Sequence, residues 1–347
     1  MPRNRKKVAV AMSGGVDSSL AAALLRKQGH DVLGITMNQM AGDAASVGDA
    51  AVRDARRAAE ALGIAHHAVD ARHAFKEKVV DYFVAEYRAG RTPNPCVECN
   101  RRIKFGYLLD TARKFGCDYL ATGHYARIDN GTLRRGLDPD KDQSYFLYVL
   151  YGCEIDRILF PLGTMHKNET RQLATDRGLP TAGRSESQDI CFIPDNDYVR
   201  FVESAIPPRE GPIVDAGGTK VGTHAGIHRY TIGQRKGLGA LGERMFVKEI
   251  RPETNTVVVA PDNELMRRRV TLRGFVSGPF DIIPGDTFDT QIRYRTPPSP
   301  ARMVSRDGDR VELEFVEPVR AIAPGQAAVL YRGDALAGGG TIARDKR

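Results

Sequence analysis

The first two hundred residues alternate short apolar runs with longer segments in which apolar residues recur at helical spacing. The apolar runs predict strands at 7–12, 31–37, 65–70 and 117–121. The segments between them predict helices at 18–28, 49–62, 74–88 and 100–115. Strands separated by helix-length segments indicate βαβ units and a mostly parallel sheet. Such a sheet, of the α/β class, binds ligands at the carboxyl ends of its strands.

Beyond Pro207-Pro208 the pattern changes to short β-rich runs separated by Gly, Pro, Asp and Asn, such as NTVVVAPDN and RVELEFVEP. No long helix is predicted there. We therefore expect two small β-rich domains that are split near Arg268–Val270, the last of them a β-barrel. The predicted domains are an α/β domain at 1–205, a central β-rich domain at 206–269 and a C-terminal barrel at 270–347.

Composition and charge narrow the class of protein. The 347 residues are 41% apolar and 27% charged, as in soluble globular proteins. The formal net charge of +8 favours a polyanionic partner, although a mildly basic cytosolic protein has the same balance. The N-terminal apolar run VAVAM is too short for a signal peptide or a membrane span. We expect a cytoplasmic protein without membrane contact, whose five cysteines are free thiols at rest.

A glycine-rich loop, SGGVDSS, lies between the first predicted strand and helix, with its glycines at 14 and 15. Glycines let the backbone turn tightly and bring its N–H groups close to phosphate oxygens, and the helix N-terminus adds positive potential. No GK[ST] sequence follows, which excludes the loop of kinases and GTPases. A glycine turn before a helix is also common without any ligand.

In this context SGGVDSS resembles the pyrophosphate loop of the ATP pyrophosphatase family. The resemblance implies that ATP is split into AMP and pyrophosphate while a substrate oxygen is adenylylated, with oriented N–H groups and Mg²⁺ stabilising the transition state. Met37 and Gly123 lie where an adenine pocket would form, although a core Met and a turn Gly are the plain alternatives. Asp17 is expected to matter for turnover and, as a loop-tip residue, to contribute little to folding.

The second chemical signal is TPNPCVECNRRIKF around Cys99. Its prolines indicate an extended loop before a helix that starts at Asn100. Cys99 is then expected at a helix N-terminus beside Arg101, Arg102 and Lys104, and both features lower the pKa of a thiol. A CxxC pair is also half of a structural zinc site, but a four-thiolate site needs a second close pair, which this sequence lacks.

The remaining cysteines are isolated in the sequence. Cys117 begins a predicted buried strand, and Cys153 ends a predicted helix, so both are interpreted as packing residues. Cys191 lies in the polar segment SESQDICFIP. Such a segment could carry a thiol between solvent and a site, whereas a buried core thiol is the plain alternative.

Motifs along nearly the whole chain resemble the bacterial tRNA-specific 2-thiouridylase family. They are, in order, AMSGGVDSS, TPNPCVECNRRIKF, LATGHYAR, GLDPDKDQSYFLY, SESQDICFIP, GIHRYTIGQRKGLG, IRYRTPPSPA and PGQAAVLY. The ordered set is highly specific. It implies an ATP-dependent sulfurtransferase that adenylylates O2 of the wobble uridine (U34) of tRNA and places sulfur at C2, giving 2-thiouridine.

The resemblance also implies roles for the two thiols. Cys99 corresponds to the nucleophile and Cys191 to the cysteine that carries sulfur as a persulfide. Cys99 would either reduce the persulfide to release sulfide or assist the attack, with a Cys99–Cys191 disulfide as the expected by-product. Thiol–disulfide exchange requires the two thiols to approach and to be partly ionised. Loop closure over bound tRNA would bring them together. A sulfur-relay protein or a cysteine desulfurase would load Cys191.

Further positions correspond to ligand contacts of that family. Those for ATP are Ala11, Met12, Ser13, Gly14, Gly15, Val16, Asp17, Ser18, Met37 and Gly123. Those for the target base are Asn94, Pro95 and Cys96, and those for the rest of the tRNA are His124, Lys141, Asp142, Gln143, Arg293, Tyr294 and Gln326. The β-rich domains, with the basic motif GIHRYTIGQRKGLG, are expected to grip the RNA backbone, although this motif is also typical of a solvated turn-rich loop.

One departure leaves alternatives open. Some members of the family carry Asp where this chain has Cys96, so a carboxylate role at the target base is in doubt here. Cys96, Cys99 and Cys191 could instead hold an iron–sulfur cluster, as in some other tRNA thiolation enzymes. Two other hypotheses are an amidotransferase-type ligase, which would not need Cys99 and Cys191, and a non-catalytic RNA-binding protein, which would not need the phosphate loop.

Overall fold

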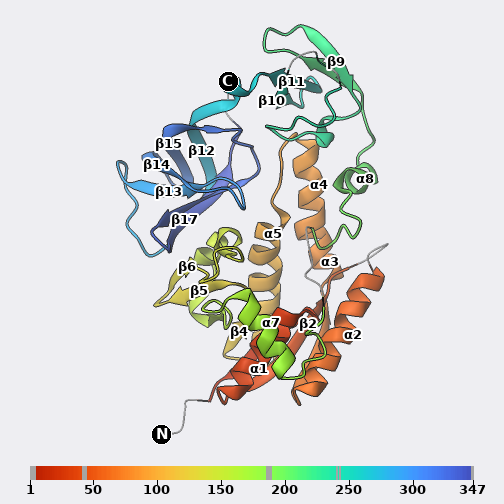
Figure 1. Cartoon of the computed structure of the whole chain (residues 1–347), viewed down its shortest axis with the longest axis vertical. Helices are drawn as coiled ribbons and strands as arrows, with labels where there is room; N and C mark the ends of the chain where they lie inside the picture. The colour runs from red at the N-terminus through yellow and green to blue at the C-terminus, as the bar shows by residue number, and fades with distance from the viewer. Residues whose placement is uncertain (1–4, 41–44, 185–189, 240, 242–243, 345–347) are drawn as a thin grey trace. The chain divides into compact units, whose positions relative to one another are not determined.

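The computed structural model describes residues 5–40, 45–184, 190–239, 241 and 244–344, and the chain divides into two compact units (Figure 1). Unit 1 consists of Met1–Val79, Cys96–Pro194 and Asp334–Leu336. Unit 2 consists of Val80–Pro95, Asp195–Gly333 and Ala337–Arg347. These units follow contacts between residues and do not test the three predicted domain ranges, which stay predictions.

Unit 1 is built on a five-stranded sheet of order β3-β2-β1-β4-β7 in which every neighbouring pair is parallel. The strands are β1 (Lys7–Ala11), β2 (Asp31–Asn38), β3 (Ala65–Asp70), β4 (Tyr119–Ala121) and β7 (Ile158–Leu159). The predicted parallel α/β sheet is therefore confirmed. The short edge strand β7 was not predicted, because two residues carry no periodicity.

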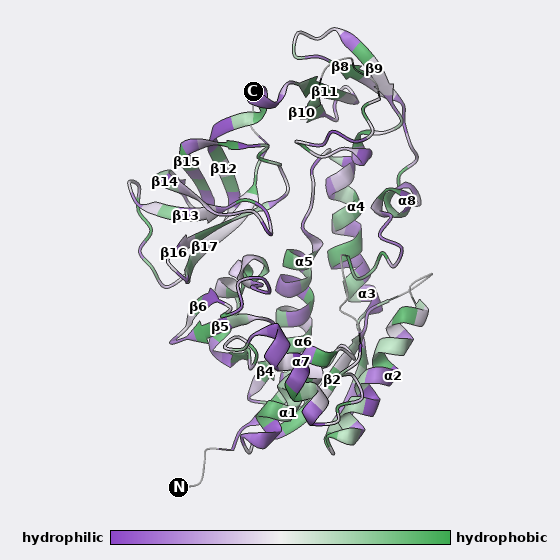
Figure 2. Cartoon of the chain, in the orientation of Figure 1, coloured by the Kyte–Doolittle hydropathy of each residue, from purple (hydrophilic) through white to green (hydrophobic). Residues whose placement is uncertain are grey.

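Three helices pack with this sheet around one apolar core: α1 (Val16–Lys27), α2 (Ala45–Ala61) and α7 (Lys167–Asp176). The middle of α1, LAAALL, is apolar on all sides (Figure 2), and the whole helix buries eight residues, so it lies inside the unit. α2 is amphipathic and contributes Ala55, Ala58 and Ala59 to the core. Across the ranges described above, no helix is both long and apolar enough to cross a membrane.

Two helical stretches of the first half are interrupted by π-helix. One runs through α3 (Arg72–Phe75), η2 (Lys76–Val80) and α4 (Asp81–Arg88), and the other through α5 (Pro95–Glu98), η3 (Cys99–Tyr107) and α6 (Leu108–Lys114). A hairpin of β5 (Ala126–Asp129) and β6 (Thr132–Arg135) also belongs to unit 1. Short 3₁₀ turns lie at Ser144–Phe146, Tyr148–Gly152, Ile155–Arg157, Ile227–Arg229 and Asp262–Leu265.

Unit 2 contains two β structures and the helix α8 (Tyr198–Glu203). The first is a four-stranded sheet of order β10-β11-β8-β9, with strands Phe246–Arg251, Thr256–Ala260, Gly211–Val214 and Lys220–His224. The second is made of β12 (Met266–Ser277), β13 (Thr287–Gln291), β14 (Ser299–Asp307), β15 (Arg310–Arg320), β16 (Ala327–Arg332) and β17 (Ala335–Ile342).

These six strands close into a barrel. Their order is β12-β15-β14-β13-β16-β17, and β17 pairs back to β12. Alternate residues of β15 point inward, so Val311, Leu313 and Phe315 are buried in the barrel core while the residues between them are not. The prediction of two small β-rich parts, the last a β-barrel, is confirmed. No long helix occurs among the described residues of this half, as predicted.

Candidate active site

The SGGVDSS loop connects the end of β1 to the start of α1. β1 pairs with β2 on one side and with β4 on the other, and the chain completes β2 and β3 before it returns to β4. The loop after β1 therefore lies where the strand order reverses, which is the usual ligand position in an open parallel sheet. Gly14 has a φ of 74°, a conformation that glycine adopts without steric cost.

The serines of the loop stabilise its conformation by hydrogen bonds within the loop. Ser13 N donates to Ser18 Oγ at 3.1 Å, and the hydroxyls of Ser18 and Ser19 donate to the Gly15 carbonyl oxygen at 3.2 and 3.0 Å. Gly15 is the N-cap of α1 and offers no side-chain acceptor. The first-turn N–H groups of a helix with such a cap are suited to bind an anion.

Asp17 lies in the first turn of α1 and is the counter-ion of a buried lysine. Lys167 Nζ donates to both carboxylate oxygens at 2.7 Å, and Tyr125 OH donates to Oδ1 at 2.8 Å. Lys167 is only 6% exposed. The premise that Asp17 is a loop-tip residue with few contacts is therefore wrong, because its carboxylate accepts from a buried ammonium and from a tyrosine hydroxyl. Sequence reasoning missed Lys167 and Tyr125, which lie more than a hundred residues away.

Gly123 packs directly against the start of α1. A Cβ at this position would lie 2.9 Å from the carbonyl carbon and Cβ of Asp17 and from the amide nitrogen of Ser18, so only glycine fits. Met37, near the carboxyl end of β2, is half-buried. The two predicted adenine contacts thus lie at or just after the carboxyl ends of the two strands that flank β1. Their role in nucleotide binding stays a prediction.

The helix that carries Cys99 begins earlier than predicted. Its first residue is Pro95 and not Asn100, so Cys99 lies in the second turn and Cys96 in the first. Proline is favoured at the first helical position because its missing N–H is not needed there. The Asn94-Pro95 dipeptide carried this signal.

A π-helical turn then places Lys104 beside Cys99. In η3 the N–H of Leu108 bonds the carbonyl of Ile103, the i→i+5 pattern of a π-helix. Residues five apart, such as Cys99 and Lys104, therefore lie about one turn apart along the helix. Lys104 is the positive charge that acts on all three thiols of this region, Cys96, Cys99 and Cys191.

These three cysteines form one group, which we call the thiol cluster. Cys96 and Cys191 reach solvent with part of their side chains, yet the protein atoms around both sulfurs raise the pKa of each thiol. For Cys191 burial raises the pKa to about 12, and the neighbouring Cys99 and Cys96 add to the effect. Gln39, which follows β2, donates from Nε2 to the sulfur of Cys191 at 3.8 Å.

The predicted acidic pKa of Cys99 is wrong for this conformation. Cys99 is 8% exposed, and burial raises the pKa of its thiol to about 11 because a desolvated thiolate is disfavoured. Arg101 and Arg102 lie 3.6 and 3.7 Å from carboxylate oxygens of Glu98. Their charges lower the pKa of Cys153 rather than that of Cys99.

The cysteines are all free. Among the described residues, no group of three or more His, Cys, Asp or Glu side chains is arranged to hold a metal ion. Cys117 is buried, and the half-buried Cys153 donates from its sulfur to the Val149 carbonyl at 3.9 Å. Both positions agree with their interpretation as packing residues.

Lys104 is joined to the β4 side of the sheet through His124. Lys104 Nζ lies 3.2 Å from His124 Nε2, and His124 Nδ1 lies 2.6 Å from Thr122 Oγ1. An ammonium can only donate, so Nε2 accepts and Nδ1 carries the proton that it donates to Thr122. Burial and the Lys104 charge hold the pKa of His124 well below its usual range, so the ring is neutral. Its predicted contact with tRNA stays a prediction.

The other predicted tRNA contacts of unit 1 support the local backbone. Asp142 accepts from the amide nitrogens of Gly136 and Ser144, at 2.9 and 3.0 Å, and pairs with Arg135 at 3.0 Å. Gln143 Oε1 accepts from Tyr125 N at 3.0 Å. Lys141, which precedes them, is half-buried.

The predicted tRNA contacts of unit 2 connect segments of that unit by hydrogen bonds. Arg293 donates to the carbonyls of Ile232 and Ala321, at 2.8 and 3.0 Å, and the adjacent Tyr294 is half-buried. Gln326 Nε2 donates to the carbonyls of Thr92 and Pro93, at 3.0 and 3.3 Å. These carbonyls immediately precede Asn94 and Pro95, so Gln326 fixes the backbone that leads to the predicted target-base residues.

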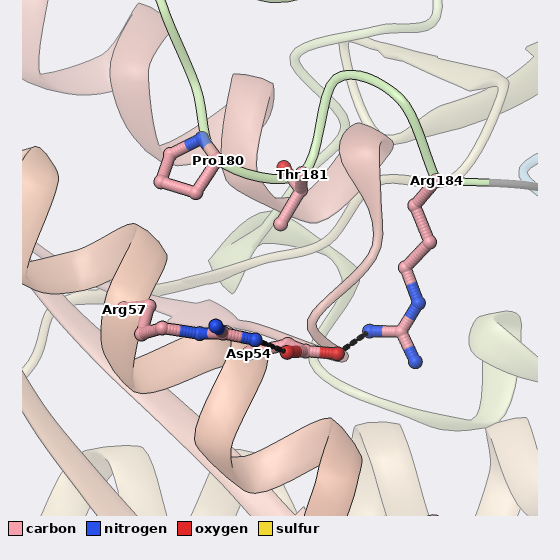
Figure 3. Close-up of a pocket in the computed structure, with 5 residues that line it drawn as sticks. All are labelled: Asp54, Arg57, Pro180, Thr181 and Arg184. Carbon is pink, nitrogen blue, oxygen red and sulfur yellow. Dashed lines mark hydrogen bonds and ion pairs between the residues drawn. The ribbon is translucent and has the colours of Figure 1, made fainter.

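A cavity of about 320 Å³ lies beside the phosphate loop (Figure 3). Asp54 of α2 lines it and pairs with Arg57 and Arg184, and Pro180 and Thr181 complete the lining. Arg184 Nη1 also donates to the Gly14 carbonyl oxygen at 2.8 Å. Sequence reasoning missed Arg184 because no motif marks it.

Three family models match the chain: the tRNA methyl transferase HUP domain at 6–195, the tRNA methyl transferase PRC-barrel domain at 199–261 and the aminomethyltransferase beta-barrel domain at 285–342. They define a class of proteins in which an α/β domain is followed by two β domains, as in this fold.

Full-length relatives identify the family within that class. The tRNA-specific 2-thiouridylase MnmA of Carboxydothermus hydrogenoformans is 49% identical over 97% of this chain and 98% of its own. That of Pelotomaculum thermopropionicum is 45% identical over 97% of both chains. The chain belongs to the tRNA-specific 2-thiouridylase MnmA family, which confirms the family resemblance. This favours the thiolation hypothesis over the ligase and the RNA-binding protein.

Asp17→Ala should destabilise the protein, because it removes the carboxylate that accepts from the buried Lys167 and from Tyr125. We expect the free energy of unfolding in urea to fall by about 1–3 kcal/mol, less than for a fully buried pair since Asp17 is partly exposed. Adding Lys167→Met removes the buried ammonium as well and should recover part of the loss. A double variant that is no more stable than Asp17→Ala would contradict this account.

Lys104→Met should raise the pKa of the Cys99 and Cys191 thiols further, because the Lys104 charge lowers both pKa values by favouring the thiolate. Alkylation of both cysteines by iodoacetamide, followed by mass spectrometry from pH 7 to 10, should slow several-fold at a given pH. Arg102→Met is the matched control, since Arg102 acts on Cys153 instead. Equal slowing of Cys99 in the two variants would refute the assignment.

Proposed function

We propose that this chain is an ATP-dependent tRNA-uridine 2-sulfurtransferase that converts the wobble uridine (U34) to 2-thiouridine. Family membership supports this function. The main observation behind this function is a continuous series of contacts from the phosphate loop to the thiol cluster. Gly123 packs on Asp17 and Ser18, the next residue, His124, accepts from Lys104, and Lys104 acts on the three thiols.

In the first step the phosphate loop holds the β- and γ-phosphates of ATP while O2 of the uridine attacks the α-phosphorus. Pyrophosphate leaves, and O2 becomes an adenylate, which is a good leaving group. The first-turn N–H groups of α1 stabilise the negative charge that develops on the phosphates. Ala11–Ser18, Met37 and Gly123 are the residues that we assign to ATP.

Mg²⁺ would supply further positive charge to the phosphates. The only carboxylate of the SGGVDSS loop, that of Asp17, is occupied by Lys167 and Tyr125. The described residues also offer no group of three potential ligands. This donor set fits an ion held mainly by ATP oxygens and water, as is common for Mg²⁺.

In the second step the terminal sulfur of a Cys191 persulfide attacks C2, and AMP leaves with O2. The Cys99 thiolate then attacks the Sγ of Cys191 and breaks the sulfur–sulfur bond. The uridine keeps the sulfur at C2, and a Cys99–Cys191 disulfide remains for an external thiol pair to reduce. The raised pKa of Cys99 means that its thiol is protonated at neutral pH until its surroundings change, and Lys104 is the cation placed to favour the thiolate.

Unit 2 would hold the tRNA. The basic motif between residues 226 and 239 places the exposed Arg235 and Lys236 on its surface. Asn94, Pro95 and Cys96 would meet the target base, which is cheapest to extrude from a single-stranded anticodon loop. We expect a sulfur-relay protein or a cysteine desulfurase as the donor to Cys191, and a cytoplasmic location.

The decisive experiment incubates the protein with ATP, Mg²⁺, a persulfide donor and unmodified tRNA, followed by mass analysis of nucleosides. We expect 2-thiouridine, with α-phosphate label in AMP. Cys99→Ser and Cys191→Ser should each abolish thiolation, because a hydroxyl can neither carry sulfane sulfur nor form the disulfide. ADP as the sole nucleotide product, or full activity of Cys191→Ser, would overturn the mechanism.

Three cysteines provide the controls. Cys117→Ser and Cys153→Ser should retain activity, since both are packing residues. Cys96→Asp should retain substantial activity if Cys96 only replaces a carboxylate. If the thiol cluster instead binds an iron–sulfur cluster, Cys96→Ser should lose iron and activity together, and iron-free wild-type protein should be inactive.

tRNA binding should weaken steeply as salt rises, because phosphate contacts release counterions. Arg235→Ala/Lys236→Ala should weaken binding and reduce the slope of log Kd against log salt by about one for each phosphate that the side chains no longer neutralise. Lys27→Ala is the matched control, since Lys27 is exposed at the far end of α1 from the phosphate loop. Filter binding at several salt concentrations measures the Kd and the slope. An unchanged slope in the double variant would exclude this motif from the interface.

A further inference from the structure

Arg184 bridges two elements that the proposed mechanism does not otherwise connect. Its guanidinium donates to the Gly14 carbonyl oxygen at 2.8 Å and pairs with Asp54 of α2. Figure 3 shows Arg184 and Arg57 approaching the Asp54 carboxylate from opposite sides. Both arginines pair with Asp54. Among the described residues, Arg184 also bonds the phosphate loop and Arg57 does not, so this one contact distinguishes the two side chains.

That contact fixes a peptide plane at the phosphate loop. In a planar trans peptide the carbonyl and the following N–H point in opposite directions. With the Gly14 carbonyl directed at Arg184, the N–H of Gly15 is directed away from it. Glycines flank this peptide, and glycine restricts peptide rotation least. Arg184 therefore supplies an orientation that the local sequence does not.

The loop is also packed tightly on this side. A Cβ on Gly14 would lie 2.7 Å from the Ala51 carbonyl oxygen, 3.0 Å from the Cβ of Asp54 and 3.0 Å from Arg184 Nη1. Asp54, which has a 21% exposed side chain, holds the guanidinium against the loop. The bridge is thus anchored at both ends within unit 1.

We propose that Arg184 is a positioning residue for the phosphate loop. Its bond to the Gly14 carbonyl oxygen keeps the Gly15 N–H turned toward the ATP phosphates. The proposal rests on the ATP use proposed above. We assign Arg184 no contact with a reacting atom. Its loss should weaken nucleotide binding and slow pyrophosphate release while leaving the thiols and tRNA binding unchanged.

The test compares Arg184→Met, Arg184→Lys and Arg57→Met. With a non-hydrolysable ATP analogue, Arg184→Met should bind about tenfold more weakly, as expected for loss of a charge-assisted hydrogen bond. Arg184→Lys should recover part of the affinity, and Arg57→Met should stay within about twofold of wild type. Alkylation of Cys99 and the Kd for tRNA should not change. Wild-type affinity in Arg184→Met, or an equal loss in Arg57→Met, would overturn the proposal.

A nucleotide-free measurement separates this inference from the proposed function. With ¹⁵N-glycine labelling, the Gly15 amide should shift and exchange faster in Arg184→Met but not in Arg57→Met, with thermal midpoints confirming that both variants fold. An unchanged Gly15 amide refutes the positioning role whether or not ATP binds. A wild-type protein that binds no ATP would refute the proposed function, while the Gly15 result would still decide the role of Arg184.

Discussion

The contact between the segment after β4 and the first turn of α1 is the constraint on which the site depends. Gly123 lies so close to Asp17 and Ser18 that no side chain fits between them. The two residues that follow Gly123 bond to different parts of the site. Tyr125 bonds Asp17, whereas His124 bonds Lys104. One short segment thus positions both the phosphate loop and the cation of the thiol cluster.

Desolvation and ionisation oppose one another in the thiol cluster. Burial keeps the thiols protonated, which protects them from oxidation because the thiolate is the reactive form. Sulfur transfer needs that thiolate. Lys104 favours the thiolate. The His124 ring that accepts a hydrogen bond from Lys104 is neutral, so it does not cancel the Lys104 charge. A change in solvation at Cys99 would therefore change the ionisation of its thiol directly, because burial is the largest cause of its raised pKa.

In unit 2 a closed barrel provides a rigid support for the segment before Cys96. Closure pairs β17 with β12, and the first residue of β17 also pairs with β6. The turn before β16 then contacts the chain at Thr92, where a Cβ on Gly325 would lie 2.9 Å from the carbonyl oxygen and Gln326 donates to it. Gln326, predicted as a tRNA contact, has a structural role in this conformation.

The sequence by itself determined the parallel sheet, the β-rich second half with its barrel, the SGGVDSS loop between β1 and α1 and, through its motifs, the family, while the roles that it predicts for Cys99 and Cys191 stay predictions. These follow from local patterns, since strand and helix periodicity and short motifs are written in neighbouring residues. Only the tertiary structure decided the partner of Asp17, the raised pKa of Cys99 and the bridge from Arg184 to Gly14. The physical reason is that burial and ion pairing depend on which distant segments meet, and the charges next to Cys99 in sequence, Arg101 and Arg102, are turned toward Glu98 by the helix.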